Sequence, residues 1–221
     1  MIAIDIEKKM RTYEGHTILR INTQIAEGSI TKVYGASGCG KTTLLKIIAG
    51  LVIPEKGKIT VNDVLWQDTN AGYSLPPQKR QVGFVFQNYA LFPNMTALEH
   101  LQYATDDKVW IDRLLHFGRL ETLVKHKPEY LSGGQQQRLA IIRALAIKPK
   151  LLLMDEPFSA LDMDMRGVII SELKGLIVEL GCTALIVSHD YNAEAPQPPK
   201  GGAFEKHGGI TFSSLVPPLG G

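Results

Sequence analysis

Apolar and polar residues alternate along three segments in the first part of the chain, at residues 2–6, 17–25 and 58–64. A period of two is typical of strands that bury one face. Glycines lie between these segments, where the chain must turn. We therefore predict an antiparallel β region that packs beside the core of the protein.

A different apolar pattern follows later in the chain. Residues 151–154 and 184–187 are continuous apolar runs, which is typical of strands covered on both faces in a parallel sheet. Residues 30–34 and 82–86 are shorter and more mixed candidates for the same sheet. The pattern predicts an α/β fold with a mostly parallel core sheet.

Helical patterns separate these strands. The predicted helices cover residues 41–49, 134–147 and 165–180. Thr96–Glu99 has the residues of a capping box, which should begin another helix near Leu98. Residues 98–130 carry mostly helical patterns and no strand signal. We therefore expect a helical subdomain, at about residues 92–147, inserted into the core.

Composition and charge limit the classes of function. The chain has 221 residues, with 24 basic and 22 acidic side chains and a formal net charge of +2. A charge so close to zero argues against a protein that binds mainly nucleic-acid phosphates, so no nucleic-acid partner is expected. Two cysteines exclude a disulfide scaffold. The sequence shows neither a signal peptide nor an apolar run long enough to span a bilayer, so we expect a soluble protein whose membrane role, if any, comes through a partner.

Residues Gly35–Thr42 read GASGCGKT and match the phosphate-binding pattern G-x-x-x-x-G-K-[ST]. The glycines allow backbone N–H groups to surround phosphate oxygens, and the following helix adds its positive N-terminus. Lys41 adds a positive charge, and Thr42 would place its hydroxyl on Mg²⁺. An apolar strand precedes the motif and a helix follows it, as the motif requires. The sequence therefore predicts a P-loop NTPase fold and a bound nucleoside triphosphate.

Polar side chains follow the other predicted core strands. Asp155 and Glu156 come directly after residues 151–154, where α/β sheets bind ligands. Asp155 suits Mg²⁺, and Glu156 suits the activation of a water molecule, although a strand-ending acid can also simply cap the next helix. Gln87 and His189 follow two further strands. We expect these groups to lie at one edge of the sheet.

The segment Leu131–Gln135 reads LSGGQ. Ser132 is a good N-cap residue, and two glycines at the beginning of a helix expose backbone donors at its positive end. This is chemically a second anion-binding site, whereas the chain contains one P-loop. The pair of sites suggests that two chains share the nucleotide.

Together these motifs resemble the ATP-binding-cassette (ABC) family, whose signature motif is LSGGQ. The resemblance covers about residues 2–195, and the motifs stand in the family's order. It identifies the P-loop with Walker A, Leu151–Asp155 with Walker B, Gln87 with the Q-loop and Ser159–Asp162 with the D-loop. It implies a head-to-tail dimer with two ATP molecules between the P-loops and the signature motifs.

The resemblance also implies a role for each site residue. The expected nucleotide-binding residues are Tyr13, Gly35, Ala36, Ser37, Gly38, Cys39, Gly40, Lys41, Thr42, Thr43, Ser132, Gly133, Gly134 and Gln135. Mg²⁺ would lie near Thr42, Gln87 and Asp155. The expected catalytic residues are Glu156, the switch histidine His189, and Lys41. Tyr13 would stack on adenine, although it can also be read as an ordinary surface tyrosine.

The distance between motifs favours a transport role. Only some forty residues, without heptads, separate Gln87 from Leu131, whereas DNA-repair members insert a long coiled coil there and translation members join two cassettes. Residues 87–96 are similar to the corresponding segment of importers of oxyanions, sugars and polyamines. The expected partners are a second ATPase subunit, membrane permease subunits and, indirectly, a solute-binding protein. The expected location is the inner face of the cell membrane, with molybdate or sulfate as a weakly favoured solute.

Two other functions stay open from the sequence. The first is a soluble ABC-type ATPase without a membrane subunit. The second is a pseudo-ATPase that only binds nucleotide, which conflicts with the presence of Glu156 and His189.

The last segment departs from the family pattern. After Ala195 the chain becomes rich in proline and glycine, which resist regular structure. We therefore predict an ABC ATPase domain at residues 1–195 and an atypical tail at residues 196–221. The tail is expected to be largely irregular and to leave the edge of the sheet poorly protected.

Overall fold

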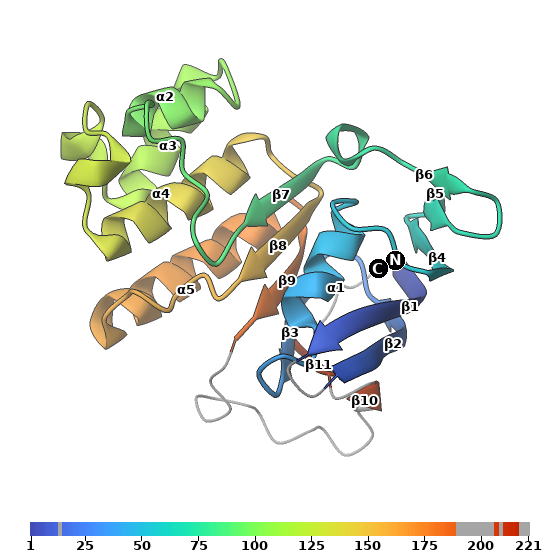
Figure 1. Cartoon of the computed structure of the whole chain (residues 1–221). Helices are drawn as coiled ribbons and strands as arrows, with labels where there is room; N and C mark the ends of the chain where they lie inside the picture. The colour runs from blue at the N-terminus through green and yellow to red at the C-terminus, as the bar shows by residue number, and fades with distance from the viewer. Residues whose placement is uncertain (13–14, 189–205, 208–209, 217–221) are drawn as a thin grey trace. The chain divides into compact units, whose positions relative to one another are not determined.

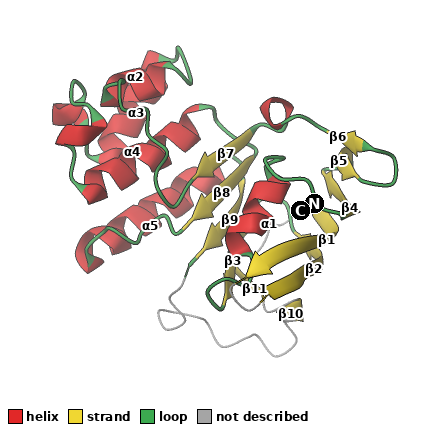
Figure 2. Ribbon diagram, in the orientation of Figure 1, coloured by secondary structure: helices red, strands yellow, loops and turns green. Residues whose placement is uncertain are grey.

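The computed structural model of the protein describes residues 1–12, 15–188, 206–207 and 210–216. Figure 1 follows the chain from its N-terminus, and Figure 2 shows that both helices and strands are present. The chain divides into two compact units, Met1–Arg80 with Thr183–Gly221, and Gln81–Cys182. Each unit is described here by itself.

The first unit contains an antiparallel sheet in the order β2-β1-β4-β5-β6. Its strands are β1 (Ile2–Thr12), β2 (Gly15–Ile25), β4 (Lys56–Val61), β5 (Val64–Asp68) and β6 (Tyr73–Ser74). The alternation in the sequence places Ile2, Ile4 and Ile6 on the buried face of β1, where each is 1% exposed. The predicted antiparallel region is therefore confirmed.

One predicted strand of this region is wrong. Residues 58–64 do not form a single strand, because β4 ends at Val61 and β5 begins at Val64. Asn62 and Asp63 lie between them with φ values of 48° and 62°. Two consecutive residues with positive φ make the tight turn of a two-residue hairpin, and Asn and Asp tolerate this conformation well.

The first unit also contains the strand that leads into the P-loop and a parallel neighbour of that strand. Strand β3 (Ile30–Gly35) pairs in parallel with β9 (Thr183–Val187). Helix α1 (Lys41–Ile48) packs on both of these strands. The 3-10 helix η1 (Pro77–Lys79) precedes Arg80. The predicted parallel pairing of residues 30–34 with a continuous apolar strand is confirmed.

The prediction of a largely irregular tail is wrong for the part that the structure describes. Strands β10 (Lys206–His207) and β11 (Ile210–Val216) pair with each other, and β11 pairs antiparallel with β3. Ile210 is fully buried and Phe212 is 9% exposed. The β-branched and aromatic residues of this run favour a strand, and they outweigh the prolines and glycines around it. The edge of β3 is therefore covered. The remainder of the predicted tail lies outside the described residues.

The second unit combines two parallel strands with helices. Strand β7 (Val82–Val85) pairs in parallel with β8 (Leu151–Asp155), and every residue of β8 is buried. The helices are α2 (Ala97–Gln102), α3 (Lys108–Gly118), η2 (Glu121–Leu123), η3 (Pro128–Tyr130), α4 (Gly133–Ala146) and α5 (Met163–Glu179). Helices α2 and α3 both pack against α4 (Figure 1).

The predicted start of α2 is confirmed in detail. The Thr96 side chain accepts a hydrogen bond from the Glu99 N–H, and the Glu99 side chain accepts one from the Thr96 N–H. Within the described part of the chain, none of the helices is long and apolar enough to cross a membrane.

Candidate functional site

The P-loop joins the end of β3 to the beginning of α1, in the first unit. Gly40, the last residue before α1, has a φ of 104°. A Cβ atom at this position would lie 2.9 Å from the Met10 sulfur and 3.1 Å from Leu19 Cδ2. Only glycine therefore fits both the backbone conformation and the space between the loop and the antiparallel sheet.

The donors of the P-loop suit a phosphate group. Among the described residues, no side chain caps the N-terminus of α1, so the positive end of the helix is formed by backbone N–H groups. Gly38 has a φ of 77°, and none of the described residues lies within 4 Å of its Cβ position. Lys41 is 6% exposed, and its ammonium donates to the Gly35 and Ala36 carbonyls at 2.8 and 2.9 Å. Amide N–H groups, an ammonium and the Thr42 hydroxyl are the donor set that a magnesium nucleotide needs.

Asp155 is the last residue of β8, in the second unit, and Glu156 begins the turn that follows it. Asp155 is 1% exposed. Glu156 has a φ of 52°, a conformation that costs energy for a residue other than glycine and that is concentrated at functional sites. Its carbonyl accepts hydrogen bonds from the Ser159 hydroxyl at 3.2 Å and from the Ser159 N–H at 3.4 Å. The turn after β8 therefore holds Glu156 in a defined, unusual conformation.

The LSGGQ segment forms the N-terminus of α4, also in the second unit. Ser132 is the N-cap residue, and its hydroxyl accepts a hydrogen bond from the Gln135 N–H at 3.3 Å. The Gln135 side chain accepts one from the Ser132 N–H at 2.8 Å. Ser132 and Gly133 are exposed. The predicted N-cap is confirmed, and the helix begins one residue earlier than expected.

The structure brings this segment and the turn after β8 together. A Cβ atom on Gly134 would lie 3.3 Å from the Ala160 carbonyl oxygen and 3.4 Å from Leu161 Cδ2. Gln137, one turn further along α4, is fully buried and hydrogen-bonds to the same turn. The sequence analysis did not single out Gln137. The signal that could have found it is a polar residue on the apolar face of α4, four residues before the buried Ile141.

Gln87 lies in an exposed turn after β7. Tyr89 and Ala90, two and three residues further along, have φ values of 62° and 47°. The Arg143 guanidinium on α4 donates to both of their carbonyls, at 3.0 and 2.6 Å, and burial lowers the pKa of this guanidinium from its ordinary value. The Phe92 N–H donates to Nε2 of His100 at 2.9 Å. Arg143 and His100 thus fix the segment after Gln87, and the sequence analysis did not single them out.

Two predicted site residues, Tyr13 and His189, lie outside the described residues. Ser188, which precedes His189, donates through its N–H to the Val33 carbonyl of β3 at 3.3 Å. The other predicted site residues fall into two groups. The P-loop belongs to the first unit, and Gln87, the LSGGQ segment, Asp155 and Glu156 belong to the second.

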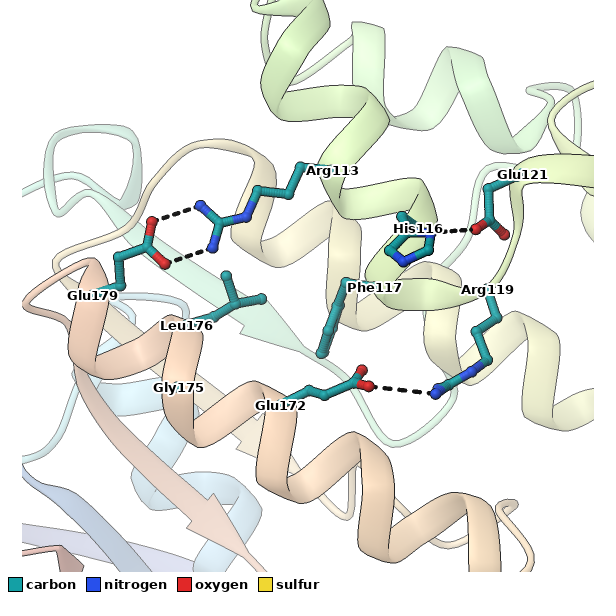
Figure 3. A pocket seen from close by; sticks show the side chains of 9 residues that line it. All are labelled: Arg113, His116, Phe117, Arg119, Glu121, Glu172, Gly175, Leu176 and Glu179. Atoms are coloured by element: carbon teal, nitrogen blue, oxygen red, sulfur yellow. Dashed lines mark hydrogen bonds and ion pairs between the residues drawn. The ribbon is translucent and has the colours of Figure 1, made fainter.

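A pocket of about 600 Å³ lies between α3 and α5 and contains none of the predicted site residues (Figure 3). Ion pairs cross it from Arg113 to Glu179 and from Arg119 to Glu172. Figure 3 also shows Leu176 of α5 beside the Arg113–Glu179 pair. The paired charges join the two helices, and we assign no ligand to this pocket.

Comparison with known proteins identifies the family. The ABC transporter family model matches residues 18–159, more than half of the chain. The molybdenum import ATP-binding protein ModC of Photorhabdus laumondii is 40% identical over 86% of this chain and 53% of its own length. The sulfate/thiosulfate import ATP-binding protein CysA of Mesostigma viride is 42% identical over 86% and 55%. The spermidine/putrescine import ATP-binding protein PotA of Lawsonia intracellularis is 42% identical over 85% and 52%. The chain thus spans about half the length of these relatives.

Solved structures agree on the fold. The dimeric ATP-binding cassette MJ0796, in a post-hydrolysis state bound to ADP and Pi, superposes with a TM-score of 0.72 at 34% identity. The match covers 87% of this chain and 89% of that one. The predicted α/β P-loop NTPase fold is therefore confirmed.

Proposed function

Because the chain belongs to the ABC transporter family, we propose that it is the ATP-binding and ATP-hydrolysing subunit of an importer. The observation that carries the proposal is the P-loop, with its uncapped helix N-terminus, its glycines at positive φ and the buried Lys41. These groups offer a cluster of donors to an anion.

Each group of the P-loop has a defined task in this proposal. The backbone N–H groups of residues 36–43 orient the phosphates, since the first turn of α1 leaves its donors without helical acceptors. Lys41 exchanges its bonds to the Gly35 and Ala36 carbonyls for phosphate oxygens, and stabilises the charge that develops there. Tyr13 is proposed to stack on the adenine.

Asp155 and Glu156 have different tasks in this proposal. Thr42, Gln87 and Asp155 are proposed to hold Mg²⁺, which supplies Lewis-acid stabilisation of the phosphate charge when it is bound. Glu156 is proposed as the general base that orients and activates the attacking water, with His189 beside the transferred phosphate. The fixed conformation of Glu156 supports this role, because a base must be positioned before it can accept a proton.

We propose that two copies act as a head-to-tail dimer, in which Ser132, Gly133, Gly134 and Gln135 of one chain contact the nucleotide of the other. The exposed N-terminus of α4 supports this arrangement. Membrane permease subunits and, through them, a solute-binding protein are the further proposed partners. Their attachment would place the chain on the inner face of the membrane.

The identity of the transported solute is the most specific part of the proposal. Relatives named for molybdenum, sulfate/thiosulfate and spermidine/putrescine import match at 40 to 42% identity, so their names support an import role more strongly than one solute. We propose an oxyanion of the molybdate or sulfate type. Uptake of labelled molybdate and sulfate, compared between cells with and without the gene for this chain, tests it. Loss of spermidine uptake alone would contradict it.

Substitution of Glu156 tests the hydrolysis step. We expect Glu156→Gln to keep ATP binding, because the P-loop is unchanged, and to accumulate a nucleotide-dependent dimer. Hydrolysis should fall by about 10²–10³-fold, as is usual when a key electrostatic or positioning group is lost. The measurements are phosphate release and size-exclusion chromatography with ATP.

The matched control is Glu172→Gln, which removes an exposed carboxylate from α5 of the same unit. We expect this control to hydrolyse ATP like the wild type. Wild-type turnover in Glu156→Gln would overturn the assignment of the general base.

The alternative function, an ABC-type ATPase without a membrane subunit, predicts a different partner. Affinity purification from solubilised membranes should recover a polytopic membrane protein if the importer proposal is right. Recovery of the chain with soluble proteins alone would favour the alternative.

A further inference from the structure

Gln137 is a buried polar residue on α4, and both the nitrogen and the oxygen of its amide group form hydrogen bonds to the turn at residues 156–160. Its Nε2 donates to the Glu156 carbonyl at 3.2 Å and to the Ser159 hydroxyl at 3.3 Å. Its Oε1 accepts a hydrogen bond from the Ala160 N–H at 3.1 Å. The side chain is fully buried, so water does not compete strongly for these bonds.

The turn that Gln137 holds contains the proposed general base. The Glu156 carbonyl lies at the centre of it, with hydrogen bonds from Gln137, the Ser159 hydroxyl and the Ser159 N–H. Glu156 itself has a φ of 52°, which persists only where surrounding contacts determine it. Two of these donors belong to Ser159 within the turn, and the third belongs to Gln137 on helix α4.

A second contact joins the same two elements. The beginning of α4 packs on the turn so closely that a Cβ atom on Gly134 would meet the Ala160 carbonyl oxygen at 3.3 Å. Gly134 and Gln137 are three residues apart, so they lie on the same face of the helix. The LSGGQ segment and the Glu156–Ala160 turn therefore contact each other at two neighbouring points.

We propose that Gln137 is a positioning residue that sets the conformation of Glu156 and links it to the position of the LSGGQ helix. A shift of α4 would move the amide of Gln137, and with it the carbonyl of Glu156. The proposal rests on the proposed role of Glu156 in hydrolysis. It goes beyond that role, because it names the residue through which the LSGGQ helix acts on the base.

The chemistry of the side chain explains why a glutamine lies here. The turn presents a carbonyl and a hydroxyl oxygen, which accept hydrogen bonds, and an N–H, which donates one. A primary amide matches both kinds of group, whereas leucine matches neither and a glutamate carboxylate can only accept. Gln137→Leu keeps a similar volume and removes all three hydrogen bonds.

The first test compares steady-state kinetics of Gln137→Leu with those of the wild type. We expect kcat for ATP hydrolysis to fall about 10- to 100-fold, as for other residues that orient a reacting group. Nucleotide affinity, measured by titration with a fluorescent ATP analogue, should stay within about twofold, because the variant leaves the groups of the P-loop unchanged. A kcat within about twofold of the wild type would overturn the proposal.

The matched control is Thr183→Val in β9. Thr183 is also buried, and its hydroxyl accepts a hydrogen bond from the Gly28 N–H at 2.9 Å. This control loses a buried side-chain hydrogen bond outside the LSGGQ helix and the Glu156–Ala160 turn. We expect it to lower the unfolding temperature while it keeps kcat. An equal loss of kcat in both variants would show a general effect of stability and overturn the proposal.

A second readout does not depend on hydrolysis. Backbone hydrogen exchange of peptides that cover residues 156–161 should become faster in Gln137→Leu, since the Ala160 N–H loses its acceptor. Unchanged exchange there would overturn the proposal. If Gln137→Leu does not fold, kcat is measured in Gln137→Glu instead, because this variant keeps the acceptor for Ala160 and loses the donors to Glu156 and Ser159. Absence of hydrolysis in the wild type would instead contradict the proposed function, and the exchange result would still decide the positioning role.

Discussion

His100 is a fully buried histidine whose two ring nitrogens both have partners. Nε2 accepts the Phe92 N–H at 2.9 Å, so the proton resides on Nδ1, which donates to the Thr96 carbonyl at 2.7 Å. Burial, together with the nearby positive charge of Arg143, lowers the pKa of His100, and hydrogen bonding to Thr96 and the charge of Glu99 oppose this in part. The folded protein therefore keeps His100 neutral at a pH where the unfolded chain would bind a proton.

This difference predicts a pH dependence of stability. As the pH falls through about 6.5, the unfolded chain gains a proton that the folded one does not. The free energy of unfolding should then decrease, by at most about 1.4 kcal/mol per pH unit. In His100→Asn this contribution is absent, so the stability difference between the two proteins should shrink from about pH 7.5 to about pH 5.5. Urea unfolding at several pH values measures it, and parallel curves would contradict it.

Single residues of the candidate site differ in whether they could be predicted from the sequence. Lys41, Ser132, Asp155 and Glu156 stand in contiguous motifs, so their chemistry could be predicted from their neighbours in the chain. Gln137 could not be predicted in this way, because its partners are 19 to 23 residues distant and meet it only after folding. The proposed role of Gln137 therefore depends on contacts that exist only in the tertiary structure.

At the scale of elements, strand β11 is the part of the chain where composition misled. Prolines and glycines dominate residues 196–221 as a whole, yet the run Ile210–Val216 has the β-branched and aromatic residues of a strand. The strand finds its hydrogen-bond partners on β3, far away in sequence. Likewise, the hairpin at Asn62 and Asp63 depends on two residues with positive φ inside an otherwise alternating segment. The continuous apolar strands, in contrast, could be predicted from the sequence because their pattern is local.

The burial of β11 predicts that it contributes to stability. Ile210 is fully buried, so Ile210→Ala should lower the free energy of unfolding by about 2–5 kcal/mol through lost burial and the cavity left behind. Ser214→Ala, at an exposed position on the same strand, is the matched control and should change it by less than about 0.5 kcal/mol. Urea denaturation followed by circular dichroism gives both values. Equal stability of the Ile210→Ala protein and the control would show that β11 adds little to the fold.

At the scale of the whole molecule, two helix N-termini are proposed to bind anions, those of α1 and α4. The P-loop belongs to the first unit and the LSGGQ segment to the second. Ser132 and Gly133 are exposed, and Ser132 and Gln135 satisfy each other through the capping box. A helix N-terminus that is capped, exposed and positive is suited to an anion supplied by another molecule.

Mixing two inactive variants tests whether that molecule is a second copy of the chain. Lys41→Ala removes the P-loop ammonium, and Ser132→Arg replaces the cap of α4 with a bulky side chain. If the site is shared, a heterodimer of the two variants contains one composite site with both groups intact. Mixtures should then hydrolyse ATP well above the sum of the separate variants, with a maximum near an equal ratio. Phosphate release measured across mixing ratios decides the question, and rates that never exceed the sum would mean that each chain uses its own LSGGQ segment or none.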